Sequence, residues 1–145
     1  MDVAASLDAP YPPAAVFPWV AELERYPAWL DIVRAVEPDG SDAWRVDLRA
    51  RLGPLSRSKR LRMVLVETVV DERFRFERRE VDGRQHASWV LSGNVAPTDE
   101  GSRVTMSLNY SGGTGLPSAV ERILGHEIER CKGRLLEQVS ESQQR

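Results

Sequence analysis

Cysteine and histidine are scarce in this sequence, and their scarcity excludes several kinds of site. Cys131 is the single cysteine, so the chain can form neither an internal disulfide nor a zinc site built from several cysteines. The two histidines, His86 and His126, show no metal-ligand spacing. A catalytic pair of Cys131 and His126 is disfavoured too, because the two residues point to different sides of a helix. We therefore expect no metal, no cofactor and a reducing, cytoplasmic environment.

The sequence also lacks a long apolar run and a strong excess of charge of one sign. No stretch approaches the ~18 apolar residues of a membrane-spanning helix. Residues 1–10 lack the basic and apolar regions of a signal peptide, so we expect no stable insertion into a membrane. With 20 basic and 22 acidic residues the formal charge is -2, which argues against a nucleic-acid partner.

The length of the chain bounds its organisation. At 145 residues we expect a single domain over residues 1–145, as a monomer or a weak homodimer. A chain of this size buries roughly 68–70% of the surface that its unfolded form exposes, which is enough for one core. Any pocket must therefore be part of that core.

Strict alternation of apolar and polar residues marks the middle of the chain. Residues 44–52 alternate charged and apolar side chains, which is the pattern of a strand with one wet face. Residues 58–70, the segments around Phe74 and Trp89, and residues 104–110 repeat this pattern. Asp82-Gly83 predicts a tight hairpin between two of the strands. Since no helix separates these strands, the sheet must be antiparallel.

Helical patterns occur near both ends of the chain. Residues 12–25 form a short helical candidate that Pro18 must kink or delay, and residues 26–30 form a second short turn. Ser118 and Glu121 have the spacing of a capping box, which predicts a long helix from 118 to about 138. Its apolar residues recur every three or four positions, so one face should pack on the sheet. This stripe consists of Val120, Leu124, Ile128, Cys131, Leu135 and Val139.

Two carboxylates fall close to predicted apolar faces. Glu127 lies at the edge of the helical stripe, where partial burial would raise its pKa and suit it to acid–base chemistry. The alternative is a rim glutamate paired with an arginine of the sheet. Glu67 shares the parity of Leu61 and Met63, so it either ends the buried part of its strand or lies in a pocket, and we favour the first reading. His86 follows the Asp82-Gly83 turn and is expected to be exposed.

Three sequence features together resemble a known superfamily. They are Ala9-Pro10 followed by Val16-Phe17, the segment Tyr26-Pro27-Ala28-Trp29-Leu30, and Gly101-Ser102-Arg103-Val104-Thr105 before a long terminal helix. The chain resembles the START-like or SRPBCC superfamily, which includes polyketide cyclase/dehydrase-like proteins and lipid carriers. The resemblance implies an α+β helix-grip fold: a seven-stranded curved antiparallel sheet around the C-terminal helix, two short helices between the first and second strands, and a hydrophobic cavity.

Our leading hypothesis is a binding protein for a small hydrophobic or amphipathic ligand, such as a lipid, an isoprenoid or a polyketide-like compound. Burial in the cavity would supply affinity, and Tyr110 or Glu127 would orient the ligand. The alternative is a polyketide cyclase, aromatase or dehydratase in which Glu127 and Tyr110 are the catalytic candidates. The expected lining is Trp29, Trp44, Leu48, Met63, Leu65, Phe76, Trp89, Leu91, Met106, Leu108, Tyr110, Leu124, Glu127, Ile128 and Cys131.

A third hypothesis does not involve a pocket. Residues 43–84 carry 12 basic residues against 7 acidic ones. The basic face over residues 45–62 could dock on an anionic surface such as a membrane or a ribosome, although a merely solvated face explains the alternation equally simply.

Overall fold

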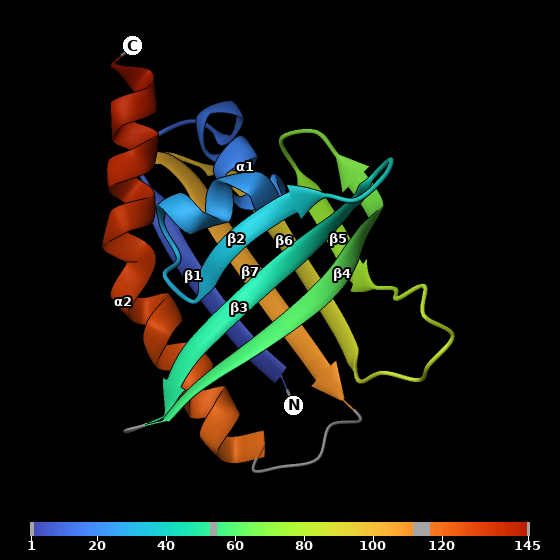
Figure 1. Ribbon diagram of the computed structural model, residues 1–145. Helices are drawn as coiled ribbons and strands as arrows, with labels where there is room; N and C mark the ends of the chain where they lie inside the picture. The colour runs from blue at the N-terminus through green and yellow to red at the C-terminus, as the bar shows by residue number, and fades with distance from the viewer. Residues whose placement is uncertain (1, 53–54, 112–116, 145) are drawn as a thin grey trace.

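A seven-stranded antiparallel sheet forms most of the molecule. The computed structural model describes residues 2–52, 55–111 and 117–144, and the side chains of residues 51–57 and 117–121 lie outside the described part. The strands follow the order β1-β7-β6-β5-β4-β3-β2 and curve as Figure 1 shows. In chain order the elements are β1 (Asp2–Ala9), α1 (Pro13–Ala21), η1 (Leu23–Ala28), β2 (Val33–Pro38), β3 (Ala43–Leu52), β4 (Leu55–Val69), β5 (Arg73–Arg78), β6 (Ser88–Thr98), β7 (Gly101–Ser111) and α2 (Pro117–Gln143).

Alternating side chains give this sheet one apolar face. Leu61 and Met63 of β4 are buried, while Arg60 on the opposite face of the strand is exposed, as the strand parity predicted. The same alternation buries Phe74 and Phe76 on β5. Because every strand pair is antiparallel, short turns suffice to connect most neighbours.

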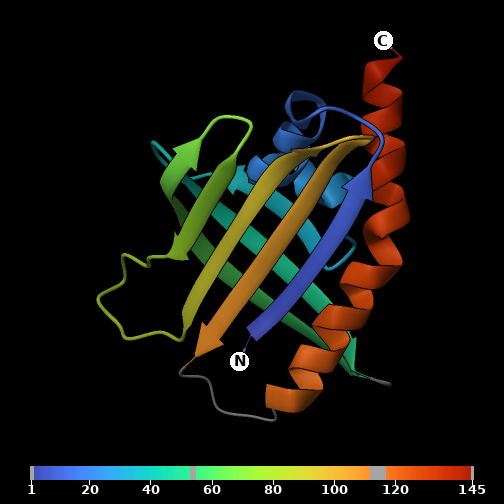
Figure 2. The ribbon, with the colours of Figure 1, turned by 180° about the vertical axis from the view of Figure 1, so that it is seen from behind.

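The helix α2 lies along the open side of the curved sheet. Figure 1 and, from behind, Figure 2 show it running beside β1, and it also contacts α1 and η1. Leu124, Cys131, Leu135 and Val139 are buried along one stripe, which confirms the predicted spacing. The helix continues past the predicted end near residue 138, because Val139 still packs in the core. The proposed capping box lies among the side chains outside the described part.

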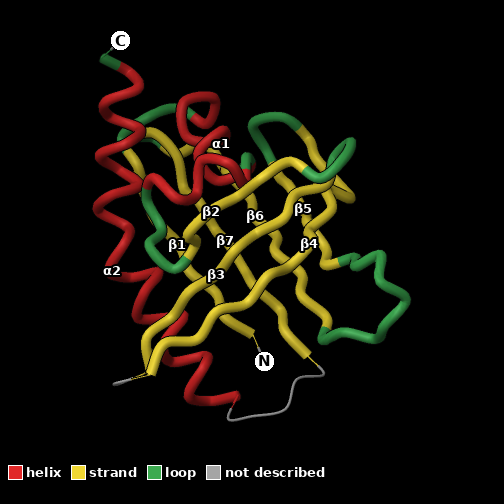
Figure 3. Tube along the Cα trace, in the orientation of Figure 1, coloured by secondary structure: helices red, strands yellow, loops and turns green. Residues whose placement is uncertain are grey.

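Two short helical elements, α1 and η1, cover one end of the sheet (Figure 3). Pro13 occupies the first turn of α1, where its missing N–H costs no hydrogen bond, and Pro18 lies inside the helix. The chain leaves helical geometry at Glu22 and re-enters it as a 3₁₀ helix, so residues 12–25 do not form one continuous helix. The two short helices predicted between β1 and β2 are confirmed. Their boundary lies at Glu22, however, and not after residue 25 as predicted.

The connection between β5 and β6 differs from the prediction. Strand β5 ends at Arg78 and β6 begins at Ser88, so Asp82-Gly83 lies in a longer loop instead of a tight hairpin. The Asp82 carboxylate accepts hydrogen bonds from the backbone N–H of Arg84, at 2.9 Å, and from His86. These local bonds compete with strand pairing and let the loop bulge away from the sheet.

The turn between β6 and β7 lies at the same end of the sheet as α1. Asp99 and Glu100 form the turn, as predicted, and β7 starts at Gly101. Next to it, Ser102 is fully buried and its hydroxyl donates a 2.5 Å hydrogen bond to the carbonyl of Tyr11. This bond ties the segment between β1 and α1 to β7.

Candidate functional site

An apolar cavity of about 140 Å³ lies between the sheet, η1 and α2. Eight elements contribute side chains to its wall, namely β1, η1, β2, β3, β4, β6, β7 and α2, and nearly all of these side chains are aliphatic or aromatic. Helix α2 supplies Leu124, Ile128, Lys132 and Leu135, and η1 with the residues that follow it supplies Leu23, Tyr26, Trp29 and Leu30. The same residues therefore form the core and the cavity wall, as expected for a chain that is long enough for only one core.

Many of the predicted lining residues meet at this cavity. They come from elements that are distant in sequence, and the sheet and α2 bring them together. The predicted residues that line the cavity are Trp29, Leu48, Met63, Trp89, Leu91, Met106, Leu108, Leu124 and Ile128.

Five other predicted residues pack around the cavity without lining it. Phe76 and Cys131 are fully buried in the core, and Leu65 is half-buried against it. Trp44 packs edge-on against Phe76, with ring centroids 5.7 Å apart, and its indole donates to the Glu24 carboxylate. Tyr110 packs edge-on against Trp89 at 5.0 Å.

Glu127 lies in a separate, charged groove between α2 and the β2–β3 side of the sheet. Its carboxylate accepts a 2.8 Å hydrogen bond from Arg130 of the same helix, one turn further on. Arg130 also donates to Asp31, and this hydrogen bond, joined by Arg134, holds the pKa of Asp31 below its ordinary value. The expected rim position is thus observed, but the partner of Glu127 is a helix arginine and not one of the sheet. The groove is lined by Asp31, Ile32, Arg34, Arg49, Ala50, Ile123, Glu127 and Arg130.

Glu67 lies outside the cavity as well. A register shift between Leu65 and Glu67 breaks the alternation of β4, and the Glu67 carboxylate is exposed and paired with Arg73 at 2.7 Å. The reading that Glu67 ends the buried part of its strand is confirmed.

Most polar groups in the cavity wall are already bonded to protein. The Tyr26 hydroxyl donates to the carbonyl of Val20 at 2.6 Å, and burial raises its pKa. The Trp29 indole donates to the carbonyl of Trp19 at 2.9 Å, and the Ser107 hydroxyl bonds to that of Ser92. The Lys132 ammonium binds Glu129 at 2.7 Å. These bonds hold the wall in shape and give each of these groups a partner within the protein.

Trp89 is the exception among the described lining residues whose side-chain polar atoms are buried. It is 8% exposed, and its indole nitrogen is buried with no hydrogen-bond partner in the described part of the structure. The Lys59 ammonium lies 5.9 Å from the centroid of the Trp89 ring. Lys59 is an exposed residue, but partial desolvation lowers its pKa, and the positive charge of Arg78 adds to this effect. Sequence reasoning missed Lys59, although it shares the parity of Leu61 and Met63 and is one of two lysines among 18 arginines.

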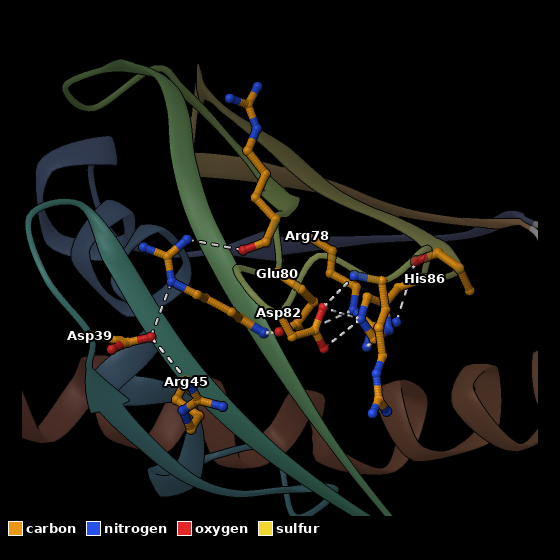
Figure 4. Close-up of polar contacts among 10 residues, drawn as sticks. Asp39, Arg45, Arg78, Glu80, Asp82 and His86 are labelled. Carbon is orange, nitrogen blue, oxygen red and sulfur yellow. Dashed lines mark hydrogen bonds and ion pairs between the residues drawn. The ribbon is translucent and has the colours of Figure 1, made fainter.

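The basic face over residues 45–62 is partly neutralised by acidic neighbours. The Asp39 carboxylate, labelled beside Arg45 in Figure 4, pairs with the guanidinium groups of Arg45 and Arg62, at 3.3 and 3.0 Å. Arg78 and Glu80, drawn beside them, form a pair at 3.2 Å with little exposure of either side chain. Among the described side chains of residues 45–62, Arg49, Lys59 and Arg60 are exposed and form no ion pair, so they are the ones that an anionic surface could meet.

Two other kinds of site are absent from the described residues. No helix within the described ranges is long and apolar enough to cross a bilayer. Among those same residues, no group of three or more histidine, cysteine, aspartate or glutamate side chains could hold a metal ion.

Comparison with known proteins gives a consistent assignment. A model of the family described as polyketide cyclase / dehydrase and lipid transport matches residues 1–136. A START superfamily protein from Mycobacterium smegmatis superposes with a TM-score of 0.69 at 14% identity, covering 97% of each chain. A Thermus thermophilus protein superposes with a TM-score of 0.71 at 21% identity, covering 98% of this chain and 99% of its own. No curated protein matches the sequence. At these identities the solved structures show the fold alone, and they confirm the START-like helix-grip architecture.

Proposed function

This chain belongs to the polyketide cyclase/dehydrase and lipid transport family, and on that premise we propose that it binds a small apolar or amphipathic molecule in the cavity between the sheet and α2. The observation that carries the proposal is the cavity itself, whose wall is formed almost entirely by apolar side chains. An apolar cavity of this kind stays dry, and the binding of an apolar molecule in it is favourable. We place this activity in the cytoplasm, on the evidence of the single cysteine.

The volume of the cavity limits the part of the ligand that it can enclose. At about 140 Å³ it is close to the volume of roughly 150 Å³ at which an engineered apolar cavity binds benzene. The enclosed part is therefore a single ring, a prenyl unit or a short acyl segment. A longer lipid, isoprenoid or polyketide-like chain would extend beyond this volume.

An enzyme of the cyclase or dehydratase type is the alternative in the same family. Its acid–base chemistry requires an ionisable group inside the cavity, whereas Glu127 lies in the charged groove and bonds to Arg130. Among the described lining residues, Lys132 directs its ammonium to Glu129, and the Tyr26 hydroxyl is bonded to Val20. Binding without turnover is accordingly the function that we propose.

Filling the cavity from its wall tests this proposal. Leu108 lines the cavity and is half-buried, so Leu108→Phe places a ring where the ligand would lie. We expect calorimetric titration to detect binding of phenylpropanol, a neutral ring compound, by the wild type and to show at least a tenfold loss in this variant. The variant should also melt at a higher temperature, because each additional buried carbon contributes up to roughly 0.8 kcal/mol.

The matched control is Leu65→Phe, the same chemical change at a half-buried sheet position outside the cavity wall. It should leave phenylpropanol binding within about twofold of the wild type, which is less than about 0.5 kcal/mol. Failure of the wild type to bind phenylpropanol, together with unchanged melting of Leu108→Phe, would overturn the proposal.

A further inference from the structure

Resting on the proposed function, we propose that the ligand carries a carboxylate next to its apolar part, and that Trp89 and Lys59 bind this carboxylate at one end of the cavity. The enclosed apolar segment and the charged group would then belong to one small amphipathic acid. This identifies the polar group that sets the orientation of the ligand, a role that the sequence had suggested for Tyr110 or Glu127.

The first observation is the unsatisfied indole of Trp89. Buried polar atoms in folded proteins nearly always have a hydrogen-bond partner, so each exception needs an explanation. The Trp89 side chain lines the cavity and its nitrogen is a donor only. A ligand oxygen in the cavity would supply the missing acceptor, as no described protein group does.

The contrast with Trp29 supports this assignment. Both tryptophans line the same cavity, but the Trp29 nitrogen donates to the carbonyl of Trp19 at 2.9 Å. Trp44, outside the wall, is likewise satisfied by Glu24 at 2.8 Å. The fold therefore provides acceptors for these indoles and leaves the donor of Trp89 open.

The second observation is the position of the Lys59 ammonium. Lys59 is paired across the β3–β4 ladder with Leu48, which lines the cavity, so Lys59 lies on the same face of the sheet. Its ammonium is 5.9 Å from the Trp89 ring centroid. No carboxylate in the described part of the chain forms an ion pair with it, in contrast to Lys132, whose ammonium binds Glu129.

The surrounding charges favour an anion over a cation. Arg78 is close enough to lower the pKa of Lys59, and Glu80, which opposes this effect, is itself bonded to Arg78 and to the backbone N–H of Arg62. An indole N–H and an ammonium are both donors, so together they match a group that only accepts. A carboxylate has two acceptor oxygens, and hydrogen bonds to ionised acceptors are the shorter and stronger ones.

Three probes with the same ring and chain, differing only in the polar end, test the inference. These are phenylpropanoate, phenylpropanol and phenylpropylamine, each titrated calorimetrically into the protein at neutral pH. We expect the acid to bind at least tenfold more tightly than the alcohol, and the amine to bind most weakly. Trp89→Phe keeps a ring in the wall but removes the donor, and Lys59→Met removes the charge but keeps an apolar chain. Each should reduce the preference for the acid over the alcohol by about tenfold, the scale expected for one hydrogen bond to a charged group.

The ratio of acid to alcohol affinity within one variant separates recognition from packing. A variant that merely disturbs the wall weakens both probes and leaves the ratio unchanged. Lys132→Met, which removes the charge of the lysine that lines the cavity but is paired with Glu129, is the matched control and should keep the wild-type ratio. If the alcohol binds as tightly as the acid, or if Trp89→Phe and Lys59→Met both keep the wild-type ratio, the carboxylate site is overturned while the proposed function stands. If none of the three probes binds, the proposed function fails and the carboxylate site fails with it.

Discussion

Adding one methyl group at Gly93 should strain the region of the sheet on which α1 packs. Gly93 is buried in β6, directly opposite Phe74 of β5 in the strand register. A Cβ atom at Gly93 would lie 2.5 and 2.6 Å from two ring carbons of Phe74 and 3.4 Å from Met106. Carbon atoms prefer separations of about 3.5–4.0 Å, so the Phe74 ring would have to retreat by about 1 Å or more.

The ring has little room for that movement. Phe74 is 2% exposed and packs against Phe17 of α1 and Phe76 of β5, with ring centroids at 6.2 and 5.9 Å. Overpacking a core of this density costs typically 1–3 kcal/mol. We therefore expect Gly93→Ala to lower the free energy of unfolding by about 1–3 kcal/mol, measured by urea denaturation with an unchanged dependence on denaturant.

A double-mutant cycle makes the reasoning refutable. Phe74→Leu removes the ring carbons that the new methyl group would meet, so the double variant should lose less stability than the two single variants together. We expect a coupling of about 1 kcal/mol or more. Additive effects, within about 0.5 kcal/mol, would refute the steric account. Gly133→Ala, on the exposed side of α2 with no neighbour near its added Cβ, is the control and should stabilise the protein by about 0.5–1 kcal/mol.

Two further predictions concern the bonds that hold the ends of the sheet and α2. Ser102→Ala removes the hydroxyl that donates to the Tyr11 carbonyl, so the free energy of unfolding should fall by about 1–3 kcal/mol in thermal or urea denaturation. Ser107→Ala, the control, should cost less because Ser107 is only half-buried, and equal losses would contradict this account. Asp31→Asn should cost a small amount of stability at pH 7, since hydrogen bonds from Arg130 and Arg134 lower the pKa of Asp31 from 3.8. A carboxylate with a lowered pKa stabilises the fold above its unfolded-state pKa, and this stabilisation is lost as the pH falls through its folded-state pKa. The urea midpoints of variant and wild type should therefore converge below pH 3.8. A constant difference at all pH values would contradict this explanation.

The periodicity of apolar residues made much of this fold predictable, because buried side chains recur every two residues along a strand and every three or four along a helix. The stripe of Leu124, Cys131 and Leu135 and the inward parity of Met63 and Trp89 follow from local spacing alone. The resemblance to START-like proteins supplied what periodicity could not, namely the closed arrangement of sheet and helix.

Features that depend on contacts between distant segments escaped prediction. The register shift that turns Glu67 outward arises from pairing with β5, and the bond of Ser102 to Tyr11 joins residues far apart in sequence. The position of Glu127 on the helical wheel was correct, but Asp31 and Arg130 decide that it faces a charged groove. The open donor of Trp89 could not be recognised from sequence, since it is defined by the lack of an acceptor in the assembled, described structure.

The pairing of β1 with β7 has a consequence for how the chain folds during synthesis. Asp2 lies opposite Asn109 and Ala9 opposite Ser102, so β1 cannot join the sheet until β7 has left the ribosome. At about 5–20 residues per second, the first strand therefore waits roughly five to twenty seconds, with Val3 and Leu7 unpaired. The hairpins from β3 to β7 can form meanwhile, because each joins neighbours in sequence. Helix α2 emerges after all of the strands, so the wall that encloses the ligand is the last to be completed, and nascent chains shorter than that expose the apolar face to chaperones.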